Sequence, residues 1–155
     1  MQSHYHIREA RDSDFDILVA FTIQEATETE GESPDPQAVA VGVGEGLGGS
    51  APATYWVAES EDGAVVGSIS VVTEWSNFRG GDYWWVQSFY IPPEHRGKGL
   101  AELLLAFVTN NARENGAIEL RLYVLQANQR AIAAYRRSGF EIAPYTVMVH
   151  PFETN

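Results

Sequence analysis

The sequence contains no cysteine, a single lysine and no long apolar run. Without cysteine, this chain has no disulfide, no thiolate nucleophile and no cysteine-bound zinc. No apolar run reaches the roughly 18 residues that a membrane-spanning helix needs. The opening residues, MQSHYHIREA, also lack the apolar core of a signal peptide. We therefore expect a cytoplasmic protein without a membrane partner.

Positive charge is scarce, because 10 Lys and Arg residues face 21 Asp and Glu residues, for a net charge of −11. This balance argues against nucleic acid or an anionic membrane surface as the main partner. It is compatible with a cationic substrate, although a generally acidic surface is the simpler explanation. The four histidines have no metal-binding spacing, so no metal is expected.

With 155 residues, the chain is long enough for one domain with a substantial core, and we expect a single domain over residues 1–155. The pattern predicts a mixed α+β order. A strand near residue 7 precedes a helix capped by Asp12, and a weak helix from Pro36 to about Val43 precedes a flexible glycine loop. The other predicted strands are 54–60, 64–75, 83–91, 118–125, 140–143 and 145–150, and the other predicted helices are 100–115 and 128–137.

The loop 96–101, RGKGLA, joins a predicted strand to an amphipathic helix and holds the only lysine, Lys98. Glycines allow successive backbone N–H groups to turn toward one anion, and a helix N-terminus adds partial positive charge. The spacing excludes a Walker phosphate loop. An exposed basic turn is the alternative, but the flanking strand and helix favour a phosphate site.

The pattern Arg96-x-x-Gly99-x-Ala101 resembles the coenzyme-binding signature of the GCN5-related N-acetyltransferases, the GNAT superfamily. A later Asn128 and the block AIAAYRRSGF, with Tyr135 in it, are similar to further motifs of that superfamily. The layout is similar to that of the spermidine/spermine type. The resemblance implies an acyl-CoA N-acyltransferase fold: a mixed, mostly antiparallel sheet with a splayed parallel strand pair and flanking helices.

The resemblance also implies acetyl-CoA as co-substrate and roles for particular residues. The loop would bind the pyrophosphate, the strand before it would bind the pantetheine arm and polarise the thioester carbonyl, and Tyr135 would protonate the departing thiolate. The expected coenzyme-binding residues are Phe89, Tyr90, Ile91, Arg96, Gly97, Lys98, Gly99, Leu100, Ala101, Asn128 and Tyr135.

The acceptor side is less well defined, because Gln87 stands where related enzymes have a glutamate and an amide cannot act as a base. Glu74 is the first alternative carboxylate, and Glu25 and Glu28 come next. Neighbouring Trp84 and Trp85 point to opposite faces of a strand, so at most one lines a pocket. The expected substrate-binding residues are Glu25, Glu28, Trp75, Trp84 and Gln87, and the expected catalytic residues are Tyr135 and Glu74.

Residues 44–49, GEGLGG, also fit the G-x-G-x-x-G pattern of dinucleotide sites. No convincing strand precedes them and no helix follows, although such a site requires both. We interpret the stretch as a flexible loop that borders the acceptor site and acts as a lid.

The expected function is transfer of an acetyl group from acetyl-CoA to a primary amine of a small molecule. The mechanism would be direct attack in a ternary complex, since no cysteine can carry the acyl group. Two alternatives stay open: a non-catalytic acyl-CoA sensor, and a protein or peptide N-acetyltransferase. A homodimer formed through the closing strands is possible.

Overall fold

The computed structural model describes residues 4–153, and the chain divides between Leu125 and Gln126 into two compact units. The first unit contains β1 (His6–Glu9), a 3-10 turn (Asp12–Asp14), α1 (Phe15–Glu30), α2 (Pro36–Leu47), β2 (Ala53–Glu59), β3 (Val65–Ser76), β4 (Gly81–Tyr90), a second 3-10 turn (Pro93–His95), α3 (Leu100–Glu114) and β5 (Leu120–Leu122). The second unit contains α4 (Gln129–Arg137). Whether the chain is one domain stays a prediction.

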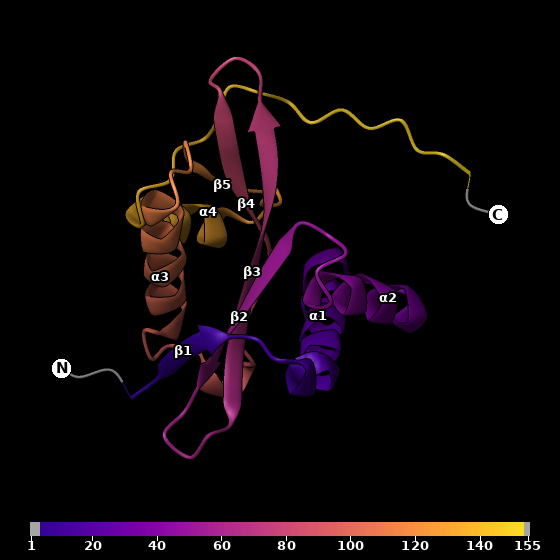
Figure 1. The fold of residues 1–155 in the computed structure, drawn as a ribbon, viewed down its shortest axis with the longest axis vertical. Coiled ribbons are helices and arrows are strands. Elements are labelled where there is room, and N and C mark those ends of the chain that lie inside the picture. The colour runs from indigo at the N-terminus through magenta and orange to yellow at the C-terminus, as the bar shows by residue number, and fades with distance from the viewer. Residues whose placement is uncertain (1–3, 154–155) are drawn as a thin grey trace. The chain divides into compact units, whose positions relative to one another are not determined.

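The first unit is built on a sheet whose strand order within the described residues is β1-β2-β3-β4-β5. All neighbours are antiparallel except β4 and β5, which run parallel (Figure 1). This parallel pair covers only three positions, Trp84 to Val86 on β4 and Leu120 to Leu122 on β5. Beyond Val86, β4 continues without β5 beside it. The mixed α+β fold with a splayed parallel pair is therefore confirmed.

Helices cover both faces of this sheet, with α1 and α2 on one side and α3 on the other (Figure 1). Leu18, Val43 and Val57 form the core beneath α1 and α2. On the opposite face, the α3 residues Leu100 and Leu104 pack against β3 at Gly67, where an added Cβ would lie 3.3–3.4 Å from both side chains. Glycine at this position lets α3 approach the sheet closely.

The start of α1 differs from the prediction that Asp12 caps it. A 3-10 turn over Asp12–Asp14 comes first, and the α-helix begins at Phe15. Asp14 is 5% exposed, and its carboxylate accepts the Arg11 backbone N–H at 2.7 Å and the Arg8 guanidinium at 2.8 Å. The prediction was wrong because the partly buried Arg8 selects the second acid of the DSD run, Asp14.

The predicted glycine lid is also wrong, since α2 extends from Pro36 through Leu47 and includes Gly42, Gly44 and Gly46. Asp35 caps this helix by accepting the Gln37 N–H at 3.0 Å. A Cβ at Gly46 would lie 2.6 Å from the Tyr55 ring. The glycine therefore makes room for an aromatic ring, a tertiary contact that overrides the low helix propensity of glycine.

The second unit contains the predicted last helix, α4, which Asn128 caps by accepting the Ala131 N–H at 3.1 Å. Gly139, with φ of 100°, follows its end. The predicted strands 140–143 and 145–150 do not form among the described residues, and β5 is shorter than the predicted 118–125. Apolar side chains of this segment stay exposed instead, such as Met148 at 90% and Phe152 at 82%.

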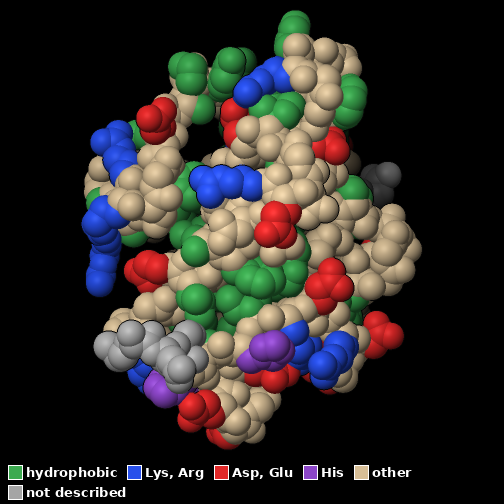
Figure 2. All heavy atoms as spheres, turned by 60° about the vertical axis from the view of Figure 1, so that its left-hand side comes forward, with side chains coloured by type: hydrophobic (Ala, Val, Ile, Leu, Met, Phe, Trp, Pro, Cys, Tyr) green, Lys and Arg blue, Asp and Glu red, His purple; other side chains and the backbone are tan. Residues whose placement is uncertain are grey.

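Acidic side chains are scattered over the face drawn in Figure 2 and do not gather into one cluster. No group of histidine and acidic side chains within residues 4–153 has a geometry that could hold a metal ion. Among the same residues, no helix is long and apolar enough to cross a membrane.

Candidate active site

A β-bulge in β4 changes the direction of its backbone near the site. Ser88 pairs with Ser70 of β3, but Val86 pairs with the next residue, Val71, so Gln87 has no partner. Before the bulge, the Trp84 N–H points away from β3 and donates to the Glu119 backbone carbonyl at 3.0 Å. Strict alternation would turn the Phe89 N–H toward β3, whereas one extra residue turns it outward.

Residues Gln87–Tyr90 form what we call the open edge of β4, because β5 pairs only as far as Val86. On this edge the Phe89 N–H donates to the Glu25 carboxylate of α1 at 3.0 Å. Both were expected site residues, Phe89 as a coenzyme-binding residue and Glu25 as a substrate-binding residue. The fold brings them into direct contact.

Glu25 sits in an unusual electrostatic position for a carboxylate. Burial raises its pKa, the Phe89 N–H lowers it, and the charge of Glu28 raises it further, giving a pKa of about 7. A carboxyl group with this pKa changes protonation state at physiological pH, which suits proton transfer.

The next turn of α1 is tied to the loop after β4 through Glu28. Its carboxylate accepts the Tyr90 hydroxyl at 2.9 Å and the Arg96 guanidinium at 2.8 Å. Arg96 also donates to the Ile91 carbonyl at 2.7 Å and lies over the Tyr90 ring, 5.5 Å from its centroid. These contacts fix the start of the glycine loop, a structural role of Arg96 that sequence analysis missed.

The glycine loop has the backbone shape that an anion site requires. Gly97 and Gly99 have φ of 77° and 83°, and an added Cβ would meet no atom within 4 Å at either position. The first intrahelical bond of α3 runs from the Leu103 N–H to the Gly99 carbonyl at 3.1 Å. The amides of Leu100 and Ala101 therefore precede it at a positive helix end. Lys98 is exposed beside them.

The two adjacent tryptophans of β4 lie on opposite faces, as expected. Trp84 stacks on Trp56 with ring centroids 6.4 Å apart, and Trp56 meets Phe107 of α3, which favours a packing role for Trp84. Trp85 lies on the other face and stacks on Tyr123 with centroids 4.5 Å apart. Trp85 is therefore the better candidate for an aromatic wall.

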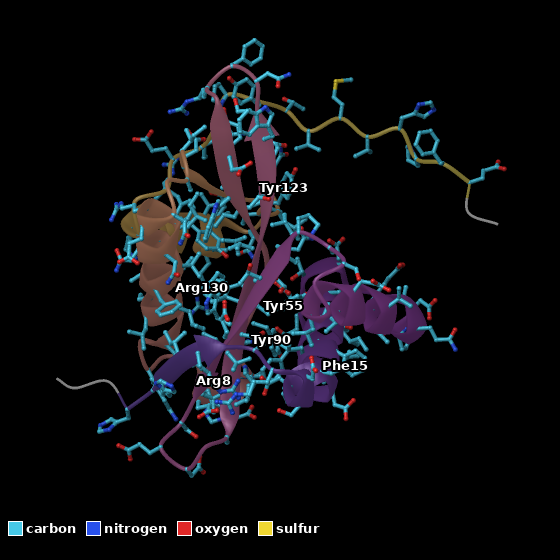
Figure 3. The ribbon with its side chains drawn as sticks, viewed as in Figure 1. Arg8, Phe15, Tyr55, Tyr90, Tyr123 and Arg130 are labelled. Carbon is cyan, nitrogen blue, oxygen red and sulfur yellow. The ribbon has the colours of Figure 1, made fainter. Side chains whose placement is uncertain are left out.

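Aromatic side chains lie along the face of the sheet that carries Trp85. The same face carries Tyr90, where α1 covers it. Figure 3 labels Tyr90 and Tyr123, which lie at different heights along this face. The Arg121 guanidinium lies over the Tyr83 ring at 3.6 Å from its centroid and 5.6 Å from that of Trp85. Glu119 accepts from Arg121 at 2.7 Å. Sequence analysis did not identify Arg121, because cross-strand neighbours in a parallel pair leave no local pattern.

Glu74 and Trp75 lie at the far end of the β3–β4 hairpin from the open edge. Phe89 pairs with Ile69 of β3, and Glu74 is five residues farther on, which corresponds to about 16 Å along the strand. Trp75 is 63% exposed, and its indole N–H donates to Asn77 at 3.0 Å. The geometry favours Glu25 over Glu74 as the carboxylate near the open edge. Gln87 is exposed at the bulge.

Tyr135 and Asn128 belong to the second unit and are described within it. Tyr135 of α4 meets Phe140 edge to face, with centroids 5.7 Å apart, and the Phe140 N–H donates to the Tyr135 carbonyl at 3.0 Å. The side-chain oxygen of Asn128 serves as the helix cap. Their roles toward the coenzyme stay predictions.

Residues 17–140 match the profile of the Acetyltransferase (GNAT) family. The chain belongs to the GNAT family. Because the matched segment begins in α1 and ends after α4, the GNAT match includes Glu25, the open edge of β4 and the glycine loop.

Individual GNAT relatives agree with this assignment. Streptothricin acetyltransferase of Streptomyces lavendulae is 37% identical over 93 residues, which are 60% of this chain and 47% of that protein. L-amino acid N-acyltransferase MnaT of Escherichia coli (strain K12) is 30% identical over 90 residues, 58% of this chain and 52% of that protein. The chain thus spans about half the length of the curated relatives it matches.

A solved structure extends the similarity over nearly the whole GNAT chain. The crystal structure of a possible acetyltransferase from Clostridium difficile 630 is 31% identical and superposes with a TM-score of 0.90. The match covers 98% of this chain and 100% of that one.

Proposed function

We propose that this protein transfers the acetyl group of acetyl-CoA to a primary amine of a small molecule. The observation that carries the proposal is the sequence of backbone donors from the open edge of β4 into the glycine loop. The outward Phe89 N–H, which donates to Glu25 in the free chain, is placed to donate to a thioester carbonyl once Glu25 moves aside, and the amides at the start of α3 are available to a pyrophosphate. The two relatives named above, a streptothricin acetyltransferase and an L-amino acid N-acyltransferase, support the same reaction class.

The loop and the strand divide the binding of acetyl-CoA between them. The amides of Gly97 to Ala101, with Lys98 beside them, would hold the pyrophosphate. The Arg96–Glu28 ion pair would hold the loop in its binding shape. The open edge would bind the amide-bearing pantetheine arm in the manner of an added strand.

The reaction is a direct acyl transfer. The neutral amine attacks the thioester carbonyl carbon, a C–N bond forms, and the C–S bond breaks. The thiolate of CoA takes a proton, for which Tyr135 is the proposed donor, and the amine loses one. An alkyl ammonium has a pKa near about 10.4, so a base must accept its proton at neutral pH. This chain has no cysteine to carry the acetyl group, which favours a ternary complex.

A free-thiol assay tests the proposal, with acetyl-CoA and a panel of polyamines, amino acids, aminoglycosides and short peptides. Calorimetric binding of acetyl-CoA accompanies the assay for the wild type and for Lys98→Ala. We expect Lys98→Ala to bind about 10-fold more weakly, because it removes one charge from the pyrophosphate site. The matched control is Arg113→Ala, which makes the same charge change at the opposite end of α3 and should leave affinity unchanged.

The outcomes separate the alternatives. Turnover on one class of small amine supports the proposal and identifies the acceptor. Binding without thiol release on any amine would favour an acyl-CoA sensor, and turnover restricted to peptides would favour a protein acetyltransferase. Absence of acetyl-CoA binding would reject the proposal.

A further inference from the structure

We propose that the Glu25 carboxylate occupies the Phe89 amide in the free enzyme and, once acetyl-CoA takes that amide, accepts the proton of the attacking amine. The inference rests on the proposed function and gives the acceptor side the base that Gln87 cannot supply. It starts from the 3.0 Å hydrogen bond between the two residues.

The first step of the argument is competition for one donor. Phe89 has a single N–H, and in the described structure Glu25 accepts it. A thioester carbonyl bound at the open edge needs the same N–H to stabilise the oxyanion. Because one N–H makes only one good hydrogen bond, the carboxylate must move aside when the acyl group binds.

The second step of the argument is the effect on Glu25 of losing the hydrogen bond from the Phe89 N–H. The Phe89 N–H is its only hydrogen-bond donor among residues 4–153, and this bond lowers its pKa against burial and the charge of Glu28. Without the bond, the two remaining influences both raise the pKa. In the molecules that keep Glu25 ionised, the carboxylate is therefore a stronger base once the coenzyme is bound, and the share of such molecules grows as pH rises.

The third step is position. The oxygen that held the Phe89 N–H lies where the carbonyl oxygen of the acetyl group would bind, so the displaced carboxylate stays within a few ångströms of the reacting carbon. Glu28 is the one charged side chain in the described structure that acts on the pKa of Glu25, and it is itself bonded to Tyr90 and Arg96. Because Glu28 is engaged by these two partners, Glu25 is the carboxylate that is left to accept the proton of the amine.

Proton transfer balances in this scheme. The amine nitrogen forms the C–N bond, and its surplus proton passes to a Glu25 oxygen. The C–S pair leaves with the thiolate, which is protonated separately. Release of the amide product and CoA returns the Phe89 N–H to Glu25, which then gives its proton to solvent.

The first test follows the Phe89 amide by NMR in the full chain as pH is changed. In the free enzyme its amide proton should titrate with a midpoint near pH 7, because the carboxylate it binds has a pKa of about 7. With saturating acetyl-CoA, the amide should stop following that titration. An amide that titrates equally in both states would overturn the displacement.

The second test measures proton linkage and kinetics in Glu25→Gln. Calorimetry in buffers of different ionisation enthalpy should show proton uptake when acetyl-CoA binds to the wild type at pH 7, and Glu25→Gln should remove the Glu25 share of it. With an acceptor amine, kcat/KM should fall about 100-fold, and the pH dependence near 7 should disappear. The matched control is Glu30→Gln, an exposed acid on the same helix, which should match the wild type.

These outcomes also separate the inference from the function it rests on. Wild-type turnover together with an unchanged pH profile in Glu25→Gln would reject Glu25 as base and leave acetyl transfer intact. Loss of acetyl-CoA binding by the wild type itself would reject both. Tighter acetyl-CoA binding by Glu25→Gln, together with slower turnover, would support both steps of the inference.

Discussion

Two carboxylates near opposite ends of α1 show how much the partners of an acid matter. Asp14 meets the guanidinium of Arg8 and the backbone N–H of Arg11, and the hydrogen bond from Arg8 is the main reason that its pKa is lowered. Glu25 has one neutral N–H as partner, so burial prevails and raises its pKa to about 7. The first acid is fixed as an anion that holds the fold together, and the second is left able to exchange a proton.

Removing the fixed acid should have the largest effect on stability. Asp14→Ala leaves Arg8 with Glu59 alone and removes the acceptor of the Arg11 N–H. We expect a loss of about 3 kcal/mol in the free energy of unfolding, because the partly buried Arg8 loses one of its two carboxylate partners and the Arg11 N–H loses its acceptor. Urea unfolding measures it, with the exposed Asp12→Ala as control. A loss below about 1 kcal/mol would contradict the assigned role of the ion pair.

Replacing Glu25, the acid that can exchange a proton, should raise the free energy of unfolding at high pH, whereas the change at Asp14 lowers it. The pKa of Glu25 in the folded state lies above its ordinary value of 4.5, so the folded state binds more protons between about pH 4.5 and 7. Its contribution to stability therefore falls as pH rises through this window. Glu25→Gln should be more stable than the wild type by about 1–3 kcal/mol at pH 8 and equal to it at pH 4. Paired unfolding curves at the two pH values measure this difference, and a destabilised variant at pH 8 would refute it.

Loosening the link between α1, which carries Glu25, and the glycine loop should have the smallest effect. Arg96→Lys keeps the charge but cannot donate to Glu28 and the Ile91 carbonyl together in the geometry of a guanidinium. We expect a loss of roughly 1 kcal/mol, seen as about fivefold weaker acetyl-CoA binding in calorimetry. The control is Arg79→Lys, whose guanidinium pairs with Glu119 near the far end of the hairpin. Equal losses in both variants would mean that Arg96 does not shape the loop.

The sequence allowed most of the fold to be predicted, because it depends on local patterns. Runs of β-branched and aromatic residues bounded by turns predicted β2, β3 and β4, and the spacing of Leu100, Leu104 and Val108 predicted α3. The predictions failed where a distant residue decides the local structure. Tyr55 requires glycine at position 46 inside a helix, and Arg8 selects Asp14 over Asp12.

The same difference between local patterns and distant contacts applies to the candidate site. The glycine loop is contiguous in sequence, and its outline was predicted together with Lys98 and Gly99. The contact between Glu25 and Phe89 spans 64 positions, and no spacing rule pairs a helix residue with a backbone amide that far away. Glu25 was therefore only a secondary candidate until the fold placed it at the open edge.

The unpaired Gln87 has a consequence for how this gene can change. The part of β4 up to Val86 and the part from Ser88 onward pair with β3 on either side of a β-bulge, and the unpaired Gln87 separates them. Substitutions at Gln87 leave the strand pairing on both sides of it intact. Loss of its codon would leave Ser88 opposite Ser70 and Phe89 opposite Ile69, so the Phe89 amide would keep its outward direction. Pairing of Gln87 in a regular ladder would instead turn that amide toward β3, so what matters at this position is that the residue stays outside the pairing.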